Sequence, residues 1–372
     1  MIKILFLIPN LAHGGAEKVL VNLVNNIDKT KFDVTLQTLF DVGVNRQHLN
    51  KDVKYIGGSK HMFRGNTHVM KLFSSQRLYS HLIKEEYDII ISYLEGPTAR
   101  IVSGCTNSKT KLVSWIHIEQ HTAKIAADSF RSIKEAMECY SKFNKTICVS
   151  NTVKQDFQSI FNLEKPVEVL YNTNESDKIV NLADEVIDDL EFDKNVFNLI
   201  SVAKIVPSKG YDRLMKIHKR LLEDGINNHV YILGIGEEQE KYEKYLKDNS
   251  LEKSFTFLGF RNNPYKYVKN ADLYVCSSRR EGFSTAVTEA LIVGTPVVST
   301  NCSGAYELLG NNCEYGIVTE NDEDALYEGI KNMLTIPGVL KNYAYRAKER
   351  GEEFSTEKTV KAVEDMLNSL ME

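Results

Sequence analysis

The sequence predicts two successive α/β domains, each a doubly wound parallel sheet covered by helices. The 372 residues suit two domains of roughly 150 residues or more. Short apolar runs typical of buried strands alternate with helical patterns, which favours parallel sheets. An acidic, polar stretch at residues 173–195 separates two series of this alternation, and we interpret it as a linker or surface hairpin.

The first series covers residues 1–172. It begins with a strand at 2–8, the glycine pair Gly14-Gly15 and a helix from Ala16 whose apolar residues have helical spacing. Further strands are expected at 34–39, 88–92, 111–116, 145–149 and 167–170.

The second series covers residues 196–355. Its expected strands are 197–202, 230–233, 255–258, 272–276, 297–300 and 316–318, and its helices start at Tyr211 or lie near 240–247 and 285–293. Helices at 322–334, 340–350 and 356–370 close the chain. Two such domains place a cleft between them, and ligands bind at the carboxyl ends of the strands.

Composition excludes several classes of protein. With 42% hydrophobic and 26% charged residues the chain is not disordered, and no apolar run reaches the roughly 18 residues of a membrane span. Pro9 cuts the apolar start short, so it is not a signal peptide. Six cysteines without a C-x-x-C pair indicate a reducing, cytoplasmic setting.

Charge divides the chain in the same way. The net charge of −4 argues against a nucleic-acid binder. Residues 1–172 carry 22 Lys/Arg against 16 Asp/Glu, whereas residues 173–372 carry 24 against 34. The two domains therefore have different expected partners.

The segment EGFSTAVTEAL, residues 281–291, joins a strand end to a helix. The turn Glu281-Gly282-Phe283-Ser284 would aim free helical N–H groups at an anion or a sugar hydroxyl. Glu281 and Glu289 could accept from sugar and ribose hydroxyls. Eight helical residues separate their backbones by about 10–12 Å, more than the roughly 5–9.5 Å between glycosidase carboxylates. The alternative is a capped helix with two solvated glutamates.

Two lysines follow strand 197–202. Lys204 and Lys209 flank a turn with Pro207 and Gly210 that opens a helix, where two ammonium groups suit a diphosphate. The alternative is that both lysines are solvated surface residues.

Three weaker features remain. Gly14-Gly15 would let a phosphate approach, but no G-x-G-x-x-G dinucleotide fingerprint is present. His117 ends a central strand and could bind substrate or be structural; with His121 it forms half a metal site without an evident third ligand. Residues 322–324 are acidic, and we interpret them as helix-dipole partners.

Together these features resemble the retaining glycosyltransferases of the GT-B fold, the large family four. The segment EGFSTAVTEALIVGTPVVST is similar to that family's E-x7-E motif, and ILGIGEE and FTFLGF are typical of its second domain. The first domain resembles the family through GGAE and His117. The resemblance implies two Rossmann-like domains facing a central cleft, an N-terminal acceptor domain joined by the last helix (356–372), and a C-terminal donor domain.

The resemblance also implies the roles of the site residues. Lys204, Lys209 and the backbone at Gly15 would hold the donor diphosphate. Glu281 would contact the donor sugar, Glu289 the ribose, and His117 would lie near the transferred sugar. The chain has Ala203-Lys204 where the family usually has Gly-Arg, so the bidentate fork is lost. The donor-binding amides would come from the turn at the helix start: Gly282, Phe283, Ser284 and Thr285.

The implied reaction is transfer of a hexose or N-acetylhexosamine, with retention, from a nucleotide sugar, UDP being favoured. Front-face attack would let the leaving β-phosphate take the acceptor proton, while cations stabilise the diphosphate, so neither a metal nor another cofactor is expected. The alternatives are a nucleotide-sugar epimerase of the same fold, a non-catalytic partner subunit of another transferase, and a periplasmic-type sugar-binding protein, for which a signal peptide would be expected.

Residues 54–84 contain no acidic residue. They hold six Lys/Arg and three His with apolar residues between them, and Val69, Leu72, Phe73 and Gln76 predict one helical face. This pattern suits an amphipathic element on an anionic membrane, with a lipid-linked acceptor; relatives that build bacterial envelope polysaccharides favour this hypothesis. The alternative is that the apolar side packs on the first domain's sheet.

Overall fold

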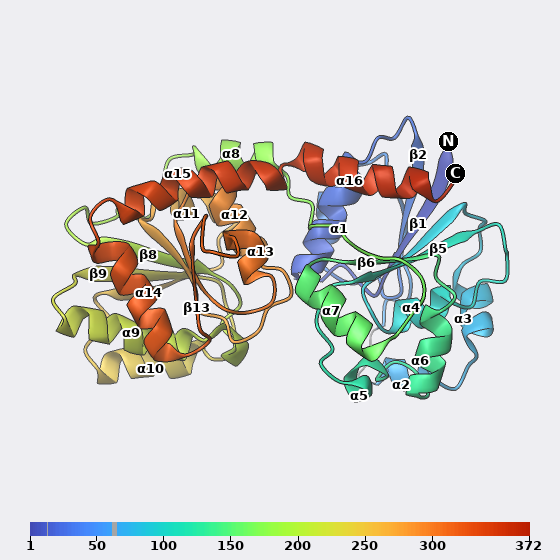
Figure 1. The fold of residues 1–372 in the computed structure, drawn as a ribbon, viewed down its shortest axis with the longest axis horizontal. Coiled ribbons are helices and arrows are strands. Elements are labelled where there is room, and N and C mark those ends of the chain that lie inside the picture. The colour runs from blue at the N-terminus through green and yellow to red at the C-terminus, as the bar shows by residue number, and fades with distance from the viewer. Residues whose placement is uncertain (13, 62–64) are drawn as a thin grey trace. The chain divides into compact units, whose positions relative to one another are not determined.

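The computed structural model describes residues 1–12, 14–61 and 65–372. Its contacts divide the chain into two compact units (Figure 1). The first unit contains Met1–Asn174 and Thr356–Glu372, and the second contains Glu175–Ser355. Each unit is built on one parallel sheet flanked by helices.

The first unit has a seven-stranded sheet in the order β3-β2-β1-β4-β5-β6-β7. Its strands are β1 (Ile2–Ile8), β2 (Phe32–Thr38), β3 (Lys54–Ile56), β4 (Ile89–Tyr93), β5 (Lys111–Ile116), β6 (Lys145–Cys148) and β7 (Val167–Val169). Every pairing is parallel, and the central strands are buried on both faces, which explains their continuous apolar runs. The short edge strand β3 was not predicted.

Helices cover this sheet: α1 (Gly15–Asn26), α2 (Asn66–Met70), α3 (Ser75–Leu82), α4 (Pro97–Val102), α5 (Ala123–Ala126), α6 (Ile133–Tyr140), α7 (Asn151–Ile160) and α16 (Thr356–Ser369), with the 3-10 turn η1 (Asn45–His48). The last helix, α16, packs on α1, and Glu364 accepts a hydrogen bond from the backbone N–H of Asp28 at 2.8 Å. The chain thus ends in the unit where it began.

The second unit has a six-stranded sheet in the order β10-β9-β8-β11-β12-β13. Its strands are β8 (Phe197–Val202), β9 (Asn228–Leu233), β10 (Phe255–Gly259), β11 (Leu273–Cys276), β12 (Val297–Thr300) and β13 (Ile317–Thr319). The order reverses between β8 and β11, so the loops after these two strands emerge side by side at the carboxyl edge. This switch point is where ligands of such sheets bind.

The helices of the second unit are α8 (Ser176–Ala183), α9 (Tyr211–Glu223), α10 (Gln239–Asp248), α11 (Tyr265–Asn270), α12 (Thr285–Val293), α13 (Ala305–Leu309), α14 (Glu323–Thr335) and α15 (Val339–Gly351), with the 3-10 turns η2 (Pro207–Lys209) and η3 (Glu352–Phe354). The apolar stripes of α9 and α14 pack with the sheet in one core.

Residues 173–195 differ from the expected linker or hairpin. They contain helix α8, which packs on α11 and α12 and buries Ile179 and Ala183. Their acidic residues pair with lysines and an arginine of the second unit, as in the Asp184–Lys269 and Asp189–Arg261 ion pairs. The acidic composition therefore reflects complementary contacts with the second unit.

The single helical face expected from Val69 to Gln76 is wrong. Helix α2 ends at Met70 and α3 begins at Ser75, with Ser74 as its N-cap, so Leu72 and Phe73 lie in the turn between two short helices. Residues 62–64 of the acid-free stretch lie outside the described residues.

Candidate functional site

The turn after β8 carries Lys209. It is the 3-10 turn η2, which ends at Gly210 with a left-handed φ of +69°. A Cβ at Gly210 would lie 2.1 Å from the carbonyl oxygen of Ser277, so only glycine permits this approach. The turn that carries Lys209 therefore lies against the loop that follows β11.

That contact brings together two residues predicted from the sequence. Lys209 Nζ lies 2.5 Å from Glu281 Oε1, and the Ser278 hydroxyl donates to the same oxygen at 2.6 Å. The Lys209 and Glu281 side chains keep 23% and 14% of their exposure, so solvent or a ligand can still reach them. An ammonium with further N–H donors beside a carboxylate can bind a phosphate with the first and a sugar hydroxyl with the second.

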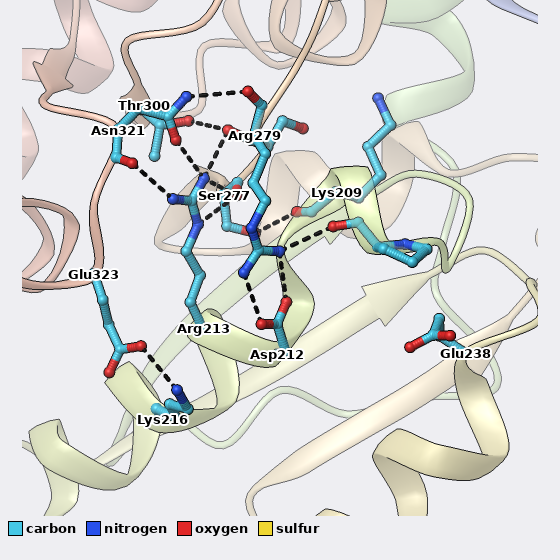
Figure 2. A network of polar contacts seen from close by, with 12 residues as sticks. Lys209, Asp212, Arg213, Lys216, Glu238, Ser277, Arg279, Thr300, Asn321 and Glu323 are labelled. Carbon is cyan, nitrogen blue, oxygen red and sulfur yellow. Dashed lines mark hydrogen bonds and ion pairs between the residues drawn. The ribbon is translucent and has the colours of Figure 1, made fainter.

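Sequence reasoning missed two arginines that hold this arrangement. Arg213 on α9 is only 4% exposed. Its guanidinium donates to the carbonyl oxygens of Ser277 and Ser278 at 2.6–2.8 Å and to Asn321 Oδ1 at 2.9 Å. Figure 2 shows the contacts of Arg213 with Ser277 and Asn321. A buried arginine that ties backbone carbonyls together cannot be distinguished in sequence from a solvated one.

Arg279 forms the second part of the network. It pairs with both carboxylate oxygens of Asp212 at 2.7 Å, as Figure 2 shows, and donates to the carbonyl of Pro207 at 2.9 Å. The hydrogen bonds from Arg279 hold the pKa of the Asp212 carboxyl below its ordinary value. The sequence signal that could have identified Arg279 is its position two residues before Glu281.

Helix α12 begins immediately after the loop. Ser284 is its N-cap and accepts from the N–H of Val287 at 3.4 Å, and Phe283 is buried. Gly282 and Thr285 are half-buried at the same helix start. This is the geometry expected of a turn that offers helical N–H groups to a ligand.

Glu289 lies within α12 and is 7% exposed. The hydroxyl of Tyr265 lies 3.4 Å from its Oε1. The alternative of two solvated glutamates is therefore wrong, because Glu281 is paired with Lys209 and Glu289 is buried. Burying a carboxylate costs free energy unless hydrogen-bond partners replace the lost water.

Lys204 is exposed in the loop between β8 and η2. The glycines of Gly234-Ile235-Gly236 allow the loop after β9 to approach it: a Cβ at Gly234 would lie 1.9 Å from the carbonyl oxygen of Ala203. These glycines therefore serve close backbone packing, in agreement with the absence of a dinucleotide fingerprint.

The other predicted residues belong to the first unit. Gly14 is the N-cap of α1 and Gly15 its first residue, so the helix start expected from the sequence is present. His13 lies outside the described residues. The Glu17 side chain folds back towards Gly14. A Cβ on Gly14 would lie 2.0 Å from the Glu17 carboxylate.

His117 follows β5 and is 9% exposed. Burial lowers its pKa to about 3, so the ring is uncharged near neutral pH. Its backbone N–H donates to Glu95 Oε2 at 2.9 Å, and its ring contacts Tyr93 and stacks near Trp115. Within the described part of the chain, His117 Nε2, the Tyr93 hydroxyl and Trp115 Nε1 have no hydrogen-bond partner. Buried polar atoms are nearly always paired, so three unpaired atoms this close together set this group apart from the rest of the core.

Among the residues that the structure describes, one group has the arrangement of potential metal ligands. Potential ligand atoms of Glu119, His121 and Asp156 lie within 4.8 Å of one another. The third ligand that the sequence did not reveal thus comes from α7, and His117 is not part of the group. Asp156 already accepts from the backbone N–H groups of Gln120 and His121 at 2.6 and 3.0 Å, which gives it a structural role.

The acidic residues 322–324 are used in the fold. Asp322 is the N-cap of α14 and accepts from the N–H of Ala325 at 2.8 Å. Glu323 and Asp324 pair with Lys216 and Arg220 of α9. Their interpretation as helix-start partners is confirmed.

Comparison with known proteins places the chain in a family. The model for Glycosyltransferase Family 4 matches residues 13–174, and the model for Glycosyl transferases group 1 matches residues 183–350. A Campylobacter jejuni protein is 28% identical over 382 residues, covering 100% of both chains. Its name is N-acetylgalactosamine-N,N'-diacetylbacillosaminyl-diphospho-undecaprenol 4-alpha-N-acetylgalactosaminyltransferase.

Solved structures agree in fold. The structure of HepE from Anabaena in complex with UDP has a TM-score of 0.77 at 20% identity, covering 99% of this chain and 100% of that one. Sucrose-phosphate synthase from Thermosynechococcus elongatus has a TM-score of 0.79 at 14% identity, covering 99% of both chains. Together with the E-x7-E segment and the Lys209–Glu281 pair, these matches show that the chain belongs to the group 1, family 4 glycosyltransferases and has their GT-B fold.

Proposed function

We propose that the protein transfers a hexose or N-acetylhexosamine, with retention, from a UDP-sugar to a lipid-linked saccharide and releases UDP, in bacterial envelope polysaccharide or glycolipid synthesis. The observation that carries the proposal is the Lys209–Glu281 pair beside the start of α12. The cation suits a diphosphate, and the carboxylate suits sugar hydroxyls. The relative from Campylobacter, named for a diphospho-undecaprenol acceptor, and the UDP complex of HepE support the two substrates.

Each residue has a role in this proposal. In the second unit, Lys204 and Lys209 bind the diphosphate, and the helix-start amides of residues 282–285 assist. Glu281 binds the donor sugar and Glu289 the ribose. The unpaired atoms around His117 favour a sugar hydroxyl as its partner.

The proposed reaction needs no protein nucleophile. The acceptor hydroxyl attacks on the face that the leaving group departs from, and the β-phosphate oxygen takes the acceptor proton. The protein stabilises the charge that develops on the diphosphate and orients both substrates.

A donor screen tests the proposal. UDP-, GDP- and ADP-sugars are compared for protection against thermal unfolding, since a ligand that binds only the native state stabilises it by about 2.7 kcal/mol at 100 times its Kd. UDP-sugars should protect most, and NMR of the product should show the donor's anomeric configuration. Isomerisation of the nucleotide sugar without acceptor would instead indicate an epimerase. Binding with no transfer to any lipid-linked saccharide would favour a non-catalytic subunit.

We also propose that transfer needs no metal, because lysines and a helix start provide the positive potential at the diphosphate. Activity should survive dialysis against EDTA unchanged. Loss of activity with rescue by magnesium or manganese would contradict this, and Glu119, His121 and Asp156 would then be the first residues to replace.

The lipid-linked acceptor requires access to a membrane, and the proposed location is the inner, cytoplasmic face. No helix in the described ranges is long and apolar enough to cross a bilayer. Leu78 of this stretch is buried, at 9%, as the alternative expects, whereas Val69, Leu72 and Phe73 are 44%, 77% and 46% exposed. We propose that this turn, within the basic stretch 54–84, contacts an anionic bilayer.

Two arginines hold the turn in place. Arg100, 1% exposed, donates to the carbonyl oxygens of Met70 and Phe73 at 2.9 and 2.7 Å, and Arg131 donates to that of Lys71 at 2.7 Å. With its backbone fixed, the turn presents apolar side chains outwards. The surrounding basic residues complement anionic lipids, at roughly 1 kcal/mol each near the surface.

Replacing Leu72 and Phe73 together by Asp should weaken binding to phosphatidylglycerol vesicles by about 10-fold or more, since each buried apolar side chain contributes about 1.5–3 kcal/mol. Co-sedimentation at low salt measures it, and higher salt should weaken wild-type binding. The matched control is Val186→Asp, an equally exposed apolar residue of the second unit at 81%. Equal binding by the double variant and the wild type would contradict the contact.

A further inference from the structure

Arg279 contacts the turn that carries Lys209 at two points and the start of α9, which follows that turn, at a third. Its backbone N–H donates to the carbonyl of Ser208 at 2.7 Å, its guanidinium donates to the carbonyl of Pro207 at 2.9 Å, and it forms a bidentate pair with Asp212. These partners lie on both sides of Lys209 in the chain. The turn is thus tied down before and after the lysine.

The same loop carries Glu281 two residues after Arg279. A further bond from the Ser277 hydroxyl to the carbonyl of Lys209, at 2.8 Å, ties the turn from the other end of the loop. The Lys209 side chain is long and flexible. Fixing the backbone of its turn therefore narrows the range of positions that its ammonium can reach. These bonds therefore fix the turn against the loop.

Arg279 and Asp212 are half exposed, at 44% and 39% for their side chains. An ion pair this open to solvent contributes little to stability, about 0–1 kcal/mol. The geometry of the contact, by contrast, is specific, because the planar guanidinium of Arg279 donates to both oxygens of the Asp212 carboxylate and to the Pro207 carbonyl. This combination fits a residue whose effect is on position more than on folding.

We propose that Arg279 is a positioning residue that holds the Lys209 ammonium beside Glu281 in the orientation that receives the donor diphosphate. The part concerning the diphosphate rests on the proposed function, whereas the tether itself does not. Arg279 acts through Lys209 and touches no reacting atom in this account.

Hydrogen exchange of the ligand-free protein tests the tether. The N–H groups of Lys209 and Gly210 bond within the turn, to Val206 and Pro207. In Arg279→Ala their exchange should become about 10-fold faster or more, because local opening no longer has to break the guanidinium contacts with Pro207 and Asp212, and the backbone and Ser277 bonds remain as the weaker restraint. Unchanged exchange would overturn the proposal, whether or not a nucleotide binds.

Arg220→Ala is the matched control. Arg220 lies on α9, is 45% exposed, and pairs with Asp324 at 2.6 Å, so it resembles Arg279 in exposure and partner but is not attached to the turn. It should leave both exchange rates unchanged. Both variants should unfold at the wild-type temperature, which separates positioning from a general loss of stability.

Calorimetric titration with UDP tests the consequence. Arg279→Ala should weaken UDP binding by about 10-fold, and Arg279→Lys, which keeps the charge without the fork, should recover only part of it. When Lys209 is already alanine, the further change Arg279→Ala should weaken UDP binding by less than about 2-fold. The effects of two substitutions are not additive when one residue acts through the other. If the loss of UDP affinity in the double variant equalled the product of the two single losses, the proposal would be overturned. A wild-type protein that does not bind UDP would overturn the proposed donor, and the exchange result would still decide the tether.

Discussion

Replacement of Lys209 by alanine is expected to lower turnover by about 10²-fold or more with the fold intact. In the proposed reaction negative charge grows on the departing diphosphate, and the ammonium beside it stabilises the transition state more than the ground state. Lys209 has its only ion pair of the described region with Glu281, so the substitution also leaves that carboxylate with Ser278 alone.

Steady-state kinetics with the donor found in the screen measures this effect. A fall in kcat and in kcat/KM by similar factors indicates an interaction made in the transition state, whereas a rise in KM alone indicates ground-state binding. The control is Lys216→Ala, which removes a lysine of α9 that pairs with Glu323 at the surface. A Lys209→Ala variant with wild-type turnover would contradict the diphosphate assignment.

The parts of the fold that could be predicted are those encoded by local pattern. Apolar runs such as 2–8, 111–116 and 197–202 coincide with β1, β5 and β8, because strands buried on both faces need continuous apolar sequence. The E-x7-E segment was also placed correctly, at a strand end and a helix start, because it too is encoded by local signals. Loop, glycine and helix signals lie next to one another in the sequence.

The parts that could not be predicted depend on contacts between distant residues. Helix α8 buries Ile179 and Ala183 and packs on α11 and α12, which follow it by about 80 residues or more, whereas its acidic sequence alone suggested a linker. Arg100 and Arg213 are buried because carbonyl oxygens about 30 and 64 residues away in the chain accept from them. Charged residues are almost never fully buried unless paired, so sequence patterns assign them to the surface.

Replacement of Arg213 by methionine is expected to have the largest effect on stability, a loss of about 3 kcal/mol or more in the free energy of unfolding. Methionine fills similar space without donors. The carbonyls of Ser277 and Ser278 and the side-chain oxygen of Asn321 would lose a charged partner inside the protein. Each such hydrogen bond contributes about 1.5–3 kcal/mol, and relief of the buried charge offsets only part of the loss.

Urea denaturation followed by far-UV circular dichroism measures the loss, as a lower midpoint at unchanged slope. Trp115 is the chain's one tryptophan and lies in the first unit, so its fluorescence reports separately on the unit that the substitution does not touch. Arg220→Met on the same helix is the control, and removal of its exposed pair should cost no more than about 1 kcal/mol. If Arg213→Met were no more destabilising than this control, the buried guanidinium would not be what holds the loop after β11, and the position of Glu281 would depend on the Ser278, Lys209 and Arg279 contacts instead.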